Sequence, residues 1–147
     1  MTPREQQLLN IIAQDLQQDC VDHQRLLELM QALHQQLLER NTQQIDQLNE
    51  QINPLISQSR QRAERRSKVL GAFGLSIGPE AMQRLLGRYP QPQRQKLLQA
   101  WANLAELTVH CKRQNERNGK LLAMQNELLE QMLSDPANAH LYTPTYY

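Results

Sequence analysis

A long heptad repeat constrains the fold of this chain more than any other feature of its sequence. Across residues 93–134, a seam of positions recurs in alternating steps of four and three, and no proline interrupts it. The seam consists of Leu97, Trp101, Leu104, Thr108, Cys111, Asn115, Asn118, Leu122, Gln125, Leu129 and Met132. This spacing predicts one long α-helix whose seam packs against partner helices.

The middle of this seam is polar, whereas its two ends are apolar. Cys111, Asn115 and Asn118 occupy the middle, and Gly119 follows directly, where a helical glycine costs roughly 1 kcal/mol relative to alanine. One interpretation is that the polar residues set a unique register at some cost in stability. The other is that the seam is incompletely covered here and receives a helix from a partner.

A second periodic segment predicts a helix over residues 3–40. A seam at 3–4 spacing runs from Leu9 to Leu37 and is apolar except at Asp19 and His23, and Thr2 with Glu5 forms a capping box at the start. Further leucines and isoleucines beside the repeat widen the apolar stripe. A stripe of this width indicates contact with more than one neighbouring helix.

Two more helices are predicted between these segments. One spans residues 43–72, begins after a cap at Asn41 and contains Pro54, which we expect to kink the helix rather than divide it. The short link after residue 40 makes this helix an antiparallel neighbour of the first. A short helix over 79–86 is expected to cap the open end of the bundle.

These segments together predict an all-α fold, a long antiparallel three-helix coiled-coil bundle with one short extra helix and an irregular C-terminal tail. The bundle covers residues 1–134 and the tail covers 135–147. One tryptophan and one phenylalanine in 147 residues are too few aromatics for most compact sheet folds. The abundance of glutamine and leucine is typical of coiled coils rather than enzymes.

Charge is distributed unevenly, although the formal net charge is only +1. Residues 1–55 carry three arginines against eight acidic side chains, whereas residues 60–68 are rich in arginine. We expect the acidic first helix to pair with this basic cluster, which contains Arg60, Arg62, Arg65, Arg66 and Lys68. The alternatives are a contact site for an acidic partner and, as a third function class, nucleic-acid binding with a steep dependence on salt.

The sequence contains no constellation typical of a metal site or a catalytic site. Cys20 with His23, and His110 with Cys111, lack the paired close spacing of structural zinc ligands. No nucleophile has an evident base and orienting group beside it. We therefore expect no metal, no cofactor and no enzyme activity, with both cysteines reduced.

The N-terminus lacks a basic-then-apolar signal sequence, and no apolar run approaches the roughly 20 residues that a membrane helix needs. The expectation is a soluble, cytoplasmic protein that does not insert into a membrane.

The last third of the helix predicted over 93–134 carries more apolar side chains than one seam can bury. They are Leu121, Leu122, Met124, Leu128, Leu129, Met132 and Leu133. Burial against the first helix accounts for part of this set, and methionines suit surfaces that accept varied partners. An amphipathic helix from another protein is the natural occupant of such a groove.

Residues 115–122 read Asn-x-x-Asn-Gly-x-Leu-Leu, and this segment resembles the signature of FlgN-type flagellar export chaperones. The Leu-Leu-Glu ending of the first helix, the upstream Trp101 and the pair Leu141-Tyr142 near the C-terminus agree with that family. The resemblance implies an α-helical cytoplasmic chaperone that binds the terminal helices of the hook–filament junction proteins, hook-associated proteins 1 and 3. Such a chaperone keeps these clients unpolymerised and delivers them to the flagellar type III export gate.

The resemblance also suggests residue roles. The client-binding region corresponds here to Asn115, Asn118, Gly119, Leu121, Leu122, Leu128, Leu129 and Met132. The export-gate contact corresponds to Tyr142. On this interpretation the protein is a monomer or weak dimer. The alternative function is a structural coiled-coil protein that self-associates through the same seam, which light scattering would reveal as a concentration-dependent oligomer.

Overall fold

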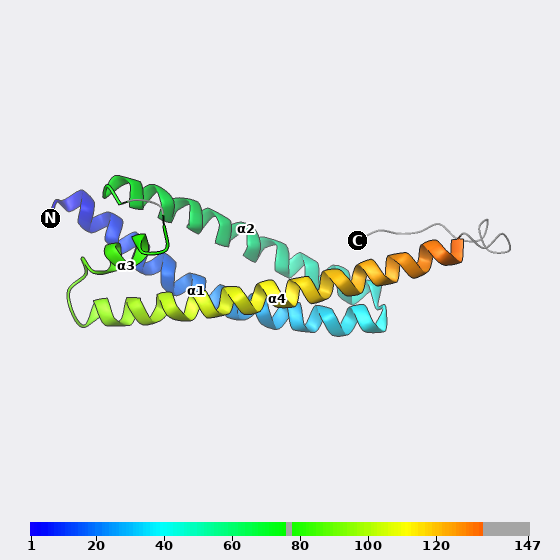
Figure 1. The fold of residues 1–147 in the computed structure, drawn as a ribbon. Helices are drawn as coiled ribbons and strands as arrows, with labels where there is room; N and C mark the ends of the chain where they lie inside the picture. Colours follow the sequence, from blue (N-terminus) through cyan, green and yellow to red (C-terminus); the bar gives the residue numbers. More distant parts are fainter. Residues whose placement is uncertain (76–77, 134–147) are drawn as a thin grey trace.

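The computed structural model describes residues 1–75 and 78–133, and these residues form four α-helices and no strand. The helices are α1 (Pro3–Glu39), α2 (Thr42–Ala72), α3 (Ala81–Leu86) and α4 (Gln93–Leu133), shown in Figure 1. The predicted all-α fold of long helices with one short extra helix is confirmed. The predicted tail and Tyr142 lie outside the described residues, and the division of the chain at residue 134 stays a prediction.

Local sequence signals determine where the first two helices begin and end. Thr2 Oγ1 accepts a hydrogen bond from the Glu5 backbone N–H at 3.1 Å, and Glu5 Oε2 accepts one from the Thr2 N–H at 3.2 Å. α1 ends at Glu39, and its C-cap residue Arg40 has a left-handed φ of 55°. Asn41 Oδ1 then caps α2 by accepting from the Gln44 N–H. The chain therefore reverses direction within two residues. α2 continues through Pro54 as a single helix.

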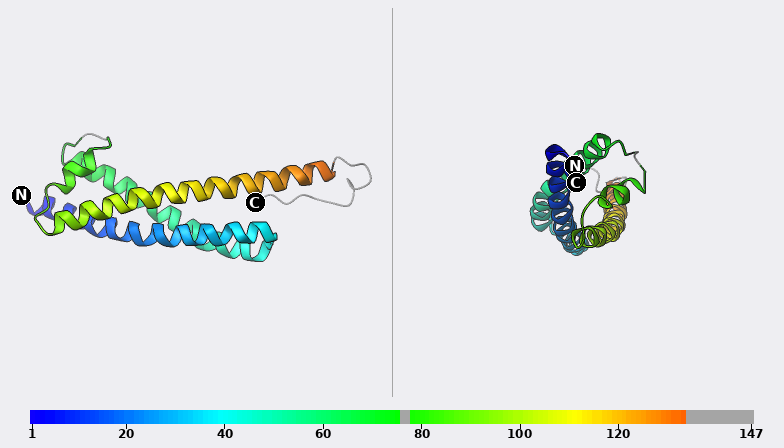
Figure 2. Two further views of the ribbon diagram at one scale, coloured as in Figure 1. Left: turned by 60° about the horizontal axis from the view of Figure 1, so that its bottom comes forward. Right: turned by 90° about the vertical axis from the view of Figure 1, so that its left-hand side faces the viewer.

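α1 is the common neighbour of the two other long helices. α2 packs antiparallel to α1, whereas α4 packs on α1 in parallel orientation (Figures 1 and 2). Within the described residues, no Cα atom of α2 lies within 8 Å of a Cα atom of α4. The three long helices therefore form an arrangement that is open between α2 and α4.

α3 closes this opening at one end of the molecule. It contacts both α2 and α4, and its residues Ala81, Met82, Leu85 and Leu86 are all buried. They join a core cluster with residues of α1, α2 and α4, and the Tyr89 hydroxyl donates a hydrogen bond to the Leu9 carbonyl at 2.6 Å. The short helix thus caps one end of the bundle, as predicted, and the rest of the opening stays uncovered.

A buried ionic cluster joins α1 to α2 beside this core. Asp19 is 1% exposed, and Arg62 Nε and Arg66 Nη1 donate to its two carboxylate oxygens at 2.6 and 2.9 Å. Arg62 also pairs with Asp22. Burial by itself lowers the pKa of Arg62, but the hydrogen bonds to Asp19 and Asp22 outweigh it, so the pKa is raised and the guanidinium stays charged.

The remaining basic residues of this stretch of α2 divide into two groups. Arg65 makes a bidentate pair with Asp15, with distances of 2.6 and 2.8 Å. Arg60 and Lys68 are exposed and have no ion-pair partner among the described residues. The predicted pairing of the acidic first helix with the basic cluster is therefore confirmed for the arginines that face α1.

We predict that Arg62→Met lowers the free energy of unfolding by about 3 kcal/mol, because Asp22 loses its cation and Asp19 keeps only Arg66. Urea denaturation followed by circular dichroism measures the change. The matched control is Arg60→Met on the same helix, where an exposed arginine is replaced and the effect is expected to stay within about 0.5 kcal/mol. Equal unfolding midpoints for the two variants would contradict a stabilising role for the cluster.

Candidate functional site

A ladder of three hydrogen bonds sets the position of α4 on α1. Three α4 side chains, each seven residues from the next, donate to backbone carbonyls of α1 that are also seven residues apart. The pairs are Cys111 Sγ to His23 at 3.5 Å, Asn118 Nδ2 to Met30 at 2.9 Å and Gln125 Nε2 to Leu37 at 2.6 Å. A shift of one residue would break all three bonds, so the ladder specifies a single parallel register.

Asn118 is the centre of this ladder. Its side chain is buried, and its Oδ1 accepts from Gln114 Nε2 at 3.1 Å and lies 2.9 Å from His34 Nδ1. Of the neighbouring seam positions, Asn115 is exposed and Gln114 is buried, whereas Leu97, Leu104, Cys111 and Asn118 are buried at seven-residue spacing.

A cavity of about 270 Å³ lies beside Asn118, between all three long helices. Its lining comprises Leu33 and Leu37 of α1, Ile45 and Asn49 of α2, and Asn115, Asn118, Gly119 and Leu122 of α4. A Cβ atom added at Gly119 would meet nothing within 4 Å, so close packing in the free protein does not require this glycine. Its missing side chain instead leaves the wall of the cavity open. The structure thus gathers four of the predicted client-binding residues around one cavity.

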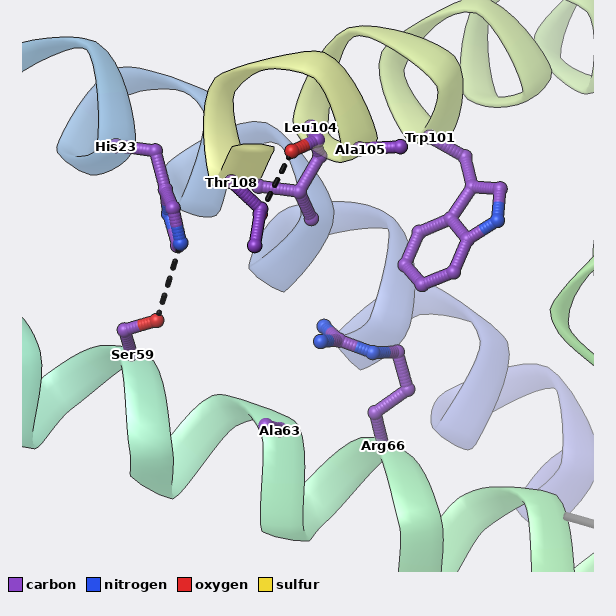
Figure 3. A pocket seen from close by; sticks show the side chains of 8 residues that line it. All are labelled: His23, Ser59, Ala63, Arg66, Trp101, Leu104, Ala105 and Thr108. Carbon is purple, nitrogen blue, oxygen red and sulfur yellow. Dashed lines mark hydrogen bonds between the residues drawn. The ribbon is translucent and has the colours of Figure 1, made fainter. Parts of the chain in front are cut away.

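A larger cavity of about 480 Å³ lies between the same three helices, closer to α3 (Figure 3). It is lined by His23 of α1, by Ser59, Ala63 and Arg66 of α2, and by Trp101, Leu104, Ala105 and Thr108 of α4. Arg66 bridges the opening, with its guanidinium carbon 5.3 Å from the centre of the Trp101 ring. We name the opening that contains both cavities, with α1 as its floor and α2 and α4 as its walls, the α2–α4 groove.

Sequence reasoning missed the larger cavity. The available signal was a pair of small-residue positions at helical spacing, Ser59 with Ala63 on one helix and Ala105 with Thr108 on another. Small side chains alone do not reveal whether two helices approach closely or stay apart. Whether these small residues line a cavity depends on where α2 and α4 lie around α1, and the sequence does not reveal that arrangement.

The last residues of α4 extend beyond the α1–α2 turn, as Figures 1 and 2 show. Gln125 binds the Leu37 carbonyl two residues before α1 ends at Glu39, so residues 126–133, which we name the overhang, lie past this support. Met124, Leu128 and Met132 are 58%, 46% and 55% exposed. Spacing of four places them on one helix face, which forms an apolar stripe open to solvent.

The other predicted apolar residues of this region are only partly exposed. Leu121, Leu122 and Leu129 are half-buried. Leu122 lines the smaller cavity, and Leu129 lies seven residues further along the same face of α4. The predicted client-binding leucines and methionines therefore lie on two faces of α4, one toward the groove and one toward solvent.

A model of the FlgN protein family matches residues 1–144 of the chain. The chain belongs to the FlgN family. FlgN-family proteins are flagellar export chaperones and not a family of enzymes, so this protein is a chaperone of flagellar biogenesis and type III export. Comparisons with curated proteins and with solved structures gave no match.

The two cysteines of this FlgN-family protein are free thiols on α1 and α4. Burial, followed by the charge of Asp19, raises the pKa of Cys20, whose Sγ donates to the Ala100 carbonyl at 3.3 Å. Burial also raises the pKa of Cys111. Both thiols therefore stay protonated at neutral pH. Residues 1–75 and 78–133 contain no group of three or more His, Cys, Asp or Glu residues that could hold a metal ion.

In that same part of the chain, no helix combines the length and the apolar character needed to cross a membrane.

We predict that Asn118→Ala lowers the free energy of unfolding of this FlgN-family protein by about 1–3 kcal/mol, because Gln114 and His34 lose their acceptor. Asn115→Ala is the matched control, an exposed asparagine three residues earlier, and should change it by less than about 0.5 kcal/mol. Chemical denaturation of both variants measures the difference. Indistinguishable stabilities would mean that the ladder does not hold α4 in register.

Proposed function

We propose that this chaperone binds the terminal helices of the hook–filament junction proteins, hook-associated proteins 1 and 3, and keeps them unpolymerised until they reach the export gate. Membership of the FlgN family supports a flagellar client. The single observation that carries the proposed client site is the solvent-exposed stripe of Met124, Leu128 and Met132 near and within the overhang. Apolar stripes on one helix face are the usual contact for an amphipathic partner helix.

The energetics favour a helical client on this stripe. Each fully buried leucine or methionine contributes roughly 1.5–3 kcal/mol, so a few such anchors offset the cost of ordering a disordered client segment. Methionine side chains are flexible and polarisable, which lets one surface accept two different client helices. A client helix covered in this way can no longer use the same apolar face to assemble with other copies of itself.

The eight client-binding residues suggested by the sequence have different proposed roles. Leu128 and Met132 offer exposed apolar contact area, whereas Leu121, Leu122 and Leu129 are half-buried and offer less. The remaining three are Asn115, Asn118 and Gly119, which line the smaller cavity. We propose that Asn118 acts by holding α4 in register, and that Asn115 and Gly119 form part of the wall that a client meets.

We predict that Leu128→Asp combined with Met132→Asp abolishes co-purification of hook-associated proteins 1 and 3, because two charges replace the apolar contact. Both positions are exposed, so the helical circular dichroism signal should be unchanged. The matched control is Leu98→Asp with Val109→Asp, which places two charges at exposed apolar positions elsewhere on α4. If the Leu128→Asp/Met132→Asp variant co-purifies with the clients as well as the control variant does, the proposed client site is refuted.

Delivery to the export gate is assigned to Tyr142, which lies outside the described residues. We predict that deletion of residues 137–147 leaves client co-purification intact and reduces swimming motility, because the tail acts after client binding. Tyr142→Ala should reproduce the motility defect, and Tyr147→Ala, a tyrosine at the extreme C-terminus, serves as the control. Normal motility of the Tyr142→Ala strain would show that the gate contact lies elsewhere.

A further inference from the structure

We infer that the α2–α4 groove is a second part of the client site and holds an amphipathic client helix with acidic side chains along its flanks. This inference rests on the proposed function, because it assumes a helical flagellar client. It assigns a role to residues of α2 and to the first half of α4, which the proposed overhang contact does not involve.

The chain itself contains a helix that occupies this opening. α3 contacts both α2 and α4, and it buries Met82, Leu85 and Leu86. Beyond α3, α2 and α4 continue along α1, and within the described residues no Cα atom of one lies within 8 Å of a Cα atom of the other. The opening is therefore already suited to a helix, and a client helix would extend the packing that α3 begins.

The groove is long enough for such a helix. Its α4 wall runs from Trp101 in the larger cavity to Leu122 in the smaller one, which corresponds to about 32 Å at 1.5 Å per helical residue. A client helix of about 20 residues would span this length. The far end of the groove, at Leu122, is also the start of the region that leads to the overhang, so one client could contact both surfaces.

Small side chains on both walls leave room for another backbone. Ser59 and Ala63 of α2 face Ala105 and Thr108 of α4 across the larger cavity (Figure 3). The same cavity is lined by the partly exposed ring of Trp101, which offers apolar contact area, and by Leu104, which belongs to the buried core. Helix axes pack 8–10 Å apart depending on the side chains at the contact, and small residues such as these favour a close approach.

Two basic side chains indicate the charge of the occupant. Lys112 lies one helical turn after Thr108 and one before Asn115, so it faces the groove between the two cavities. Arg60 follows Ser59 on the opposite wall. Both are exposed, and neither has an ion-pair partner among the described residues. An occupant with acidic flanks would complement them, whereas a basic helix would be repelled.

Trp101 supplies a direct test, because it is the only tryptophan of the chain and lines the larger cavity. The probe is a synthetic, tryptophan-free peptide of the terminal helix of hook-associated protein 1. Saturating peptide should shift the Trp101 emission to shorter wavelength and reduce its quenching by acrylamide. Trp101 is about 30 Å along α4 from Leu122, so a peptide held only at the overhang would leave its emission unchanged and overturn the inference.

Blocking variants test the same surface by affinity. Ala63→Phe with Ala105→Phe fills the larger cavity from both walls and should weaken peptide binding at least about tenfold. Both alanines are exposed, so the fold should persist, and Ala102→Phe is the control at an exposed alanine of α4 outside the cavity lining. Arg60→Glu with Lys112→Glu should also weaken binding and reduce its dependence on salt. Unchanged affinity in both groove variants would overturn the inference.

The two proposals can fail separately. Loss of binding in the groove variants with normal binding by Leu128→Asp/Met132→Asp would support the groove and remove the overhang contact. The reverse result would leave the overhang contact and remove the groove. Light scattering that shows a stable dimer of the free protein, dissociated by Ala63→Phe/Ala105→Phe, would assign the groove to a second copy and overturn a client role.

Discussion

The structure depends on α1, the helix against which α2 and α4 each make most of their contacts. On one side it presents the carboxylates of Asp15, Asp19 and Asp22 to the arginines of α2. On another it presents backbone carbonyls to the side chains of α4. Both contacts are directional and polar, so each specifies a register that apolar packing alone would leave free to slide. The open space between α2 and α4 follows, because α1 positions both walls, and the Arg66 guanidinium over the Trp101 ring adds a side-chain contact between them.

Much of this architecture could be predicted from the sequence, because its determinants are local. The capping box at Thr2 and Glu5, the cap at Asn41 and the heptad spacing each act within one or two helical turns. The charge imbalance of residues 1–55 also predicted the pairing of α1 with α2. Contacts between residues far apart in the sequence were harder to predict. The ladder uses backbone carbonyls, which every residue possesses, so no acceptor position on α1 is visible in the sequence.

The candidate site likewise has some features that could be predicted from the sequence and others that could not. The apolar excess of the last third of α4 was evident from composition, and Met124, Leu128 and Met132 are indeed exposed. The burial of Gln114 beside an exposed Asn115 was not evident, because a 3–4 pattern with polar residues fits either choice. The larger cavity was missed because small residues indicate close packing as readily as an opening. Its existence depends on where α2 and α4 lie around α1, which is a property of the whole fold.

Under the proposed function, a chaperone of helical clients must keep apolar surface exposed without losing its own structure, and the polar contacts of α1 satisfy both conditions. In a bundle positioned by apolar packing alone, the leucines and methionines would be buried in the core. Exposing these side chains would then weaken the packing between the helices. Here the ion pairs between α1 and α2, and the ladder of hydrogen bonds from α4 to α1 carbonyls, largely determine the register of the helices. Buried charges usually reduce stability, so this specificity has a cost. Met124, Leu128 and Met132 thereby stay exposed, and under the proposed function they are available to a partner. In the proposed arrangement the ladder uses Cys111, Asn118 and Gln125, whereas the exposed stripe uses Met124, Leu128 and Met132, so a client can bind or leave the stripe without disturbing the bonds that hold α4 in place.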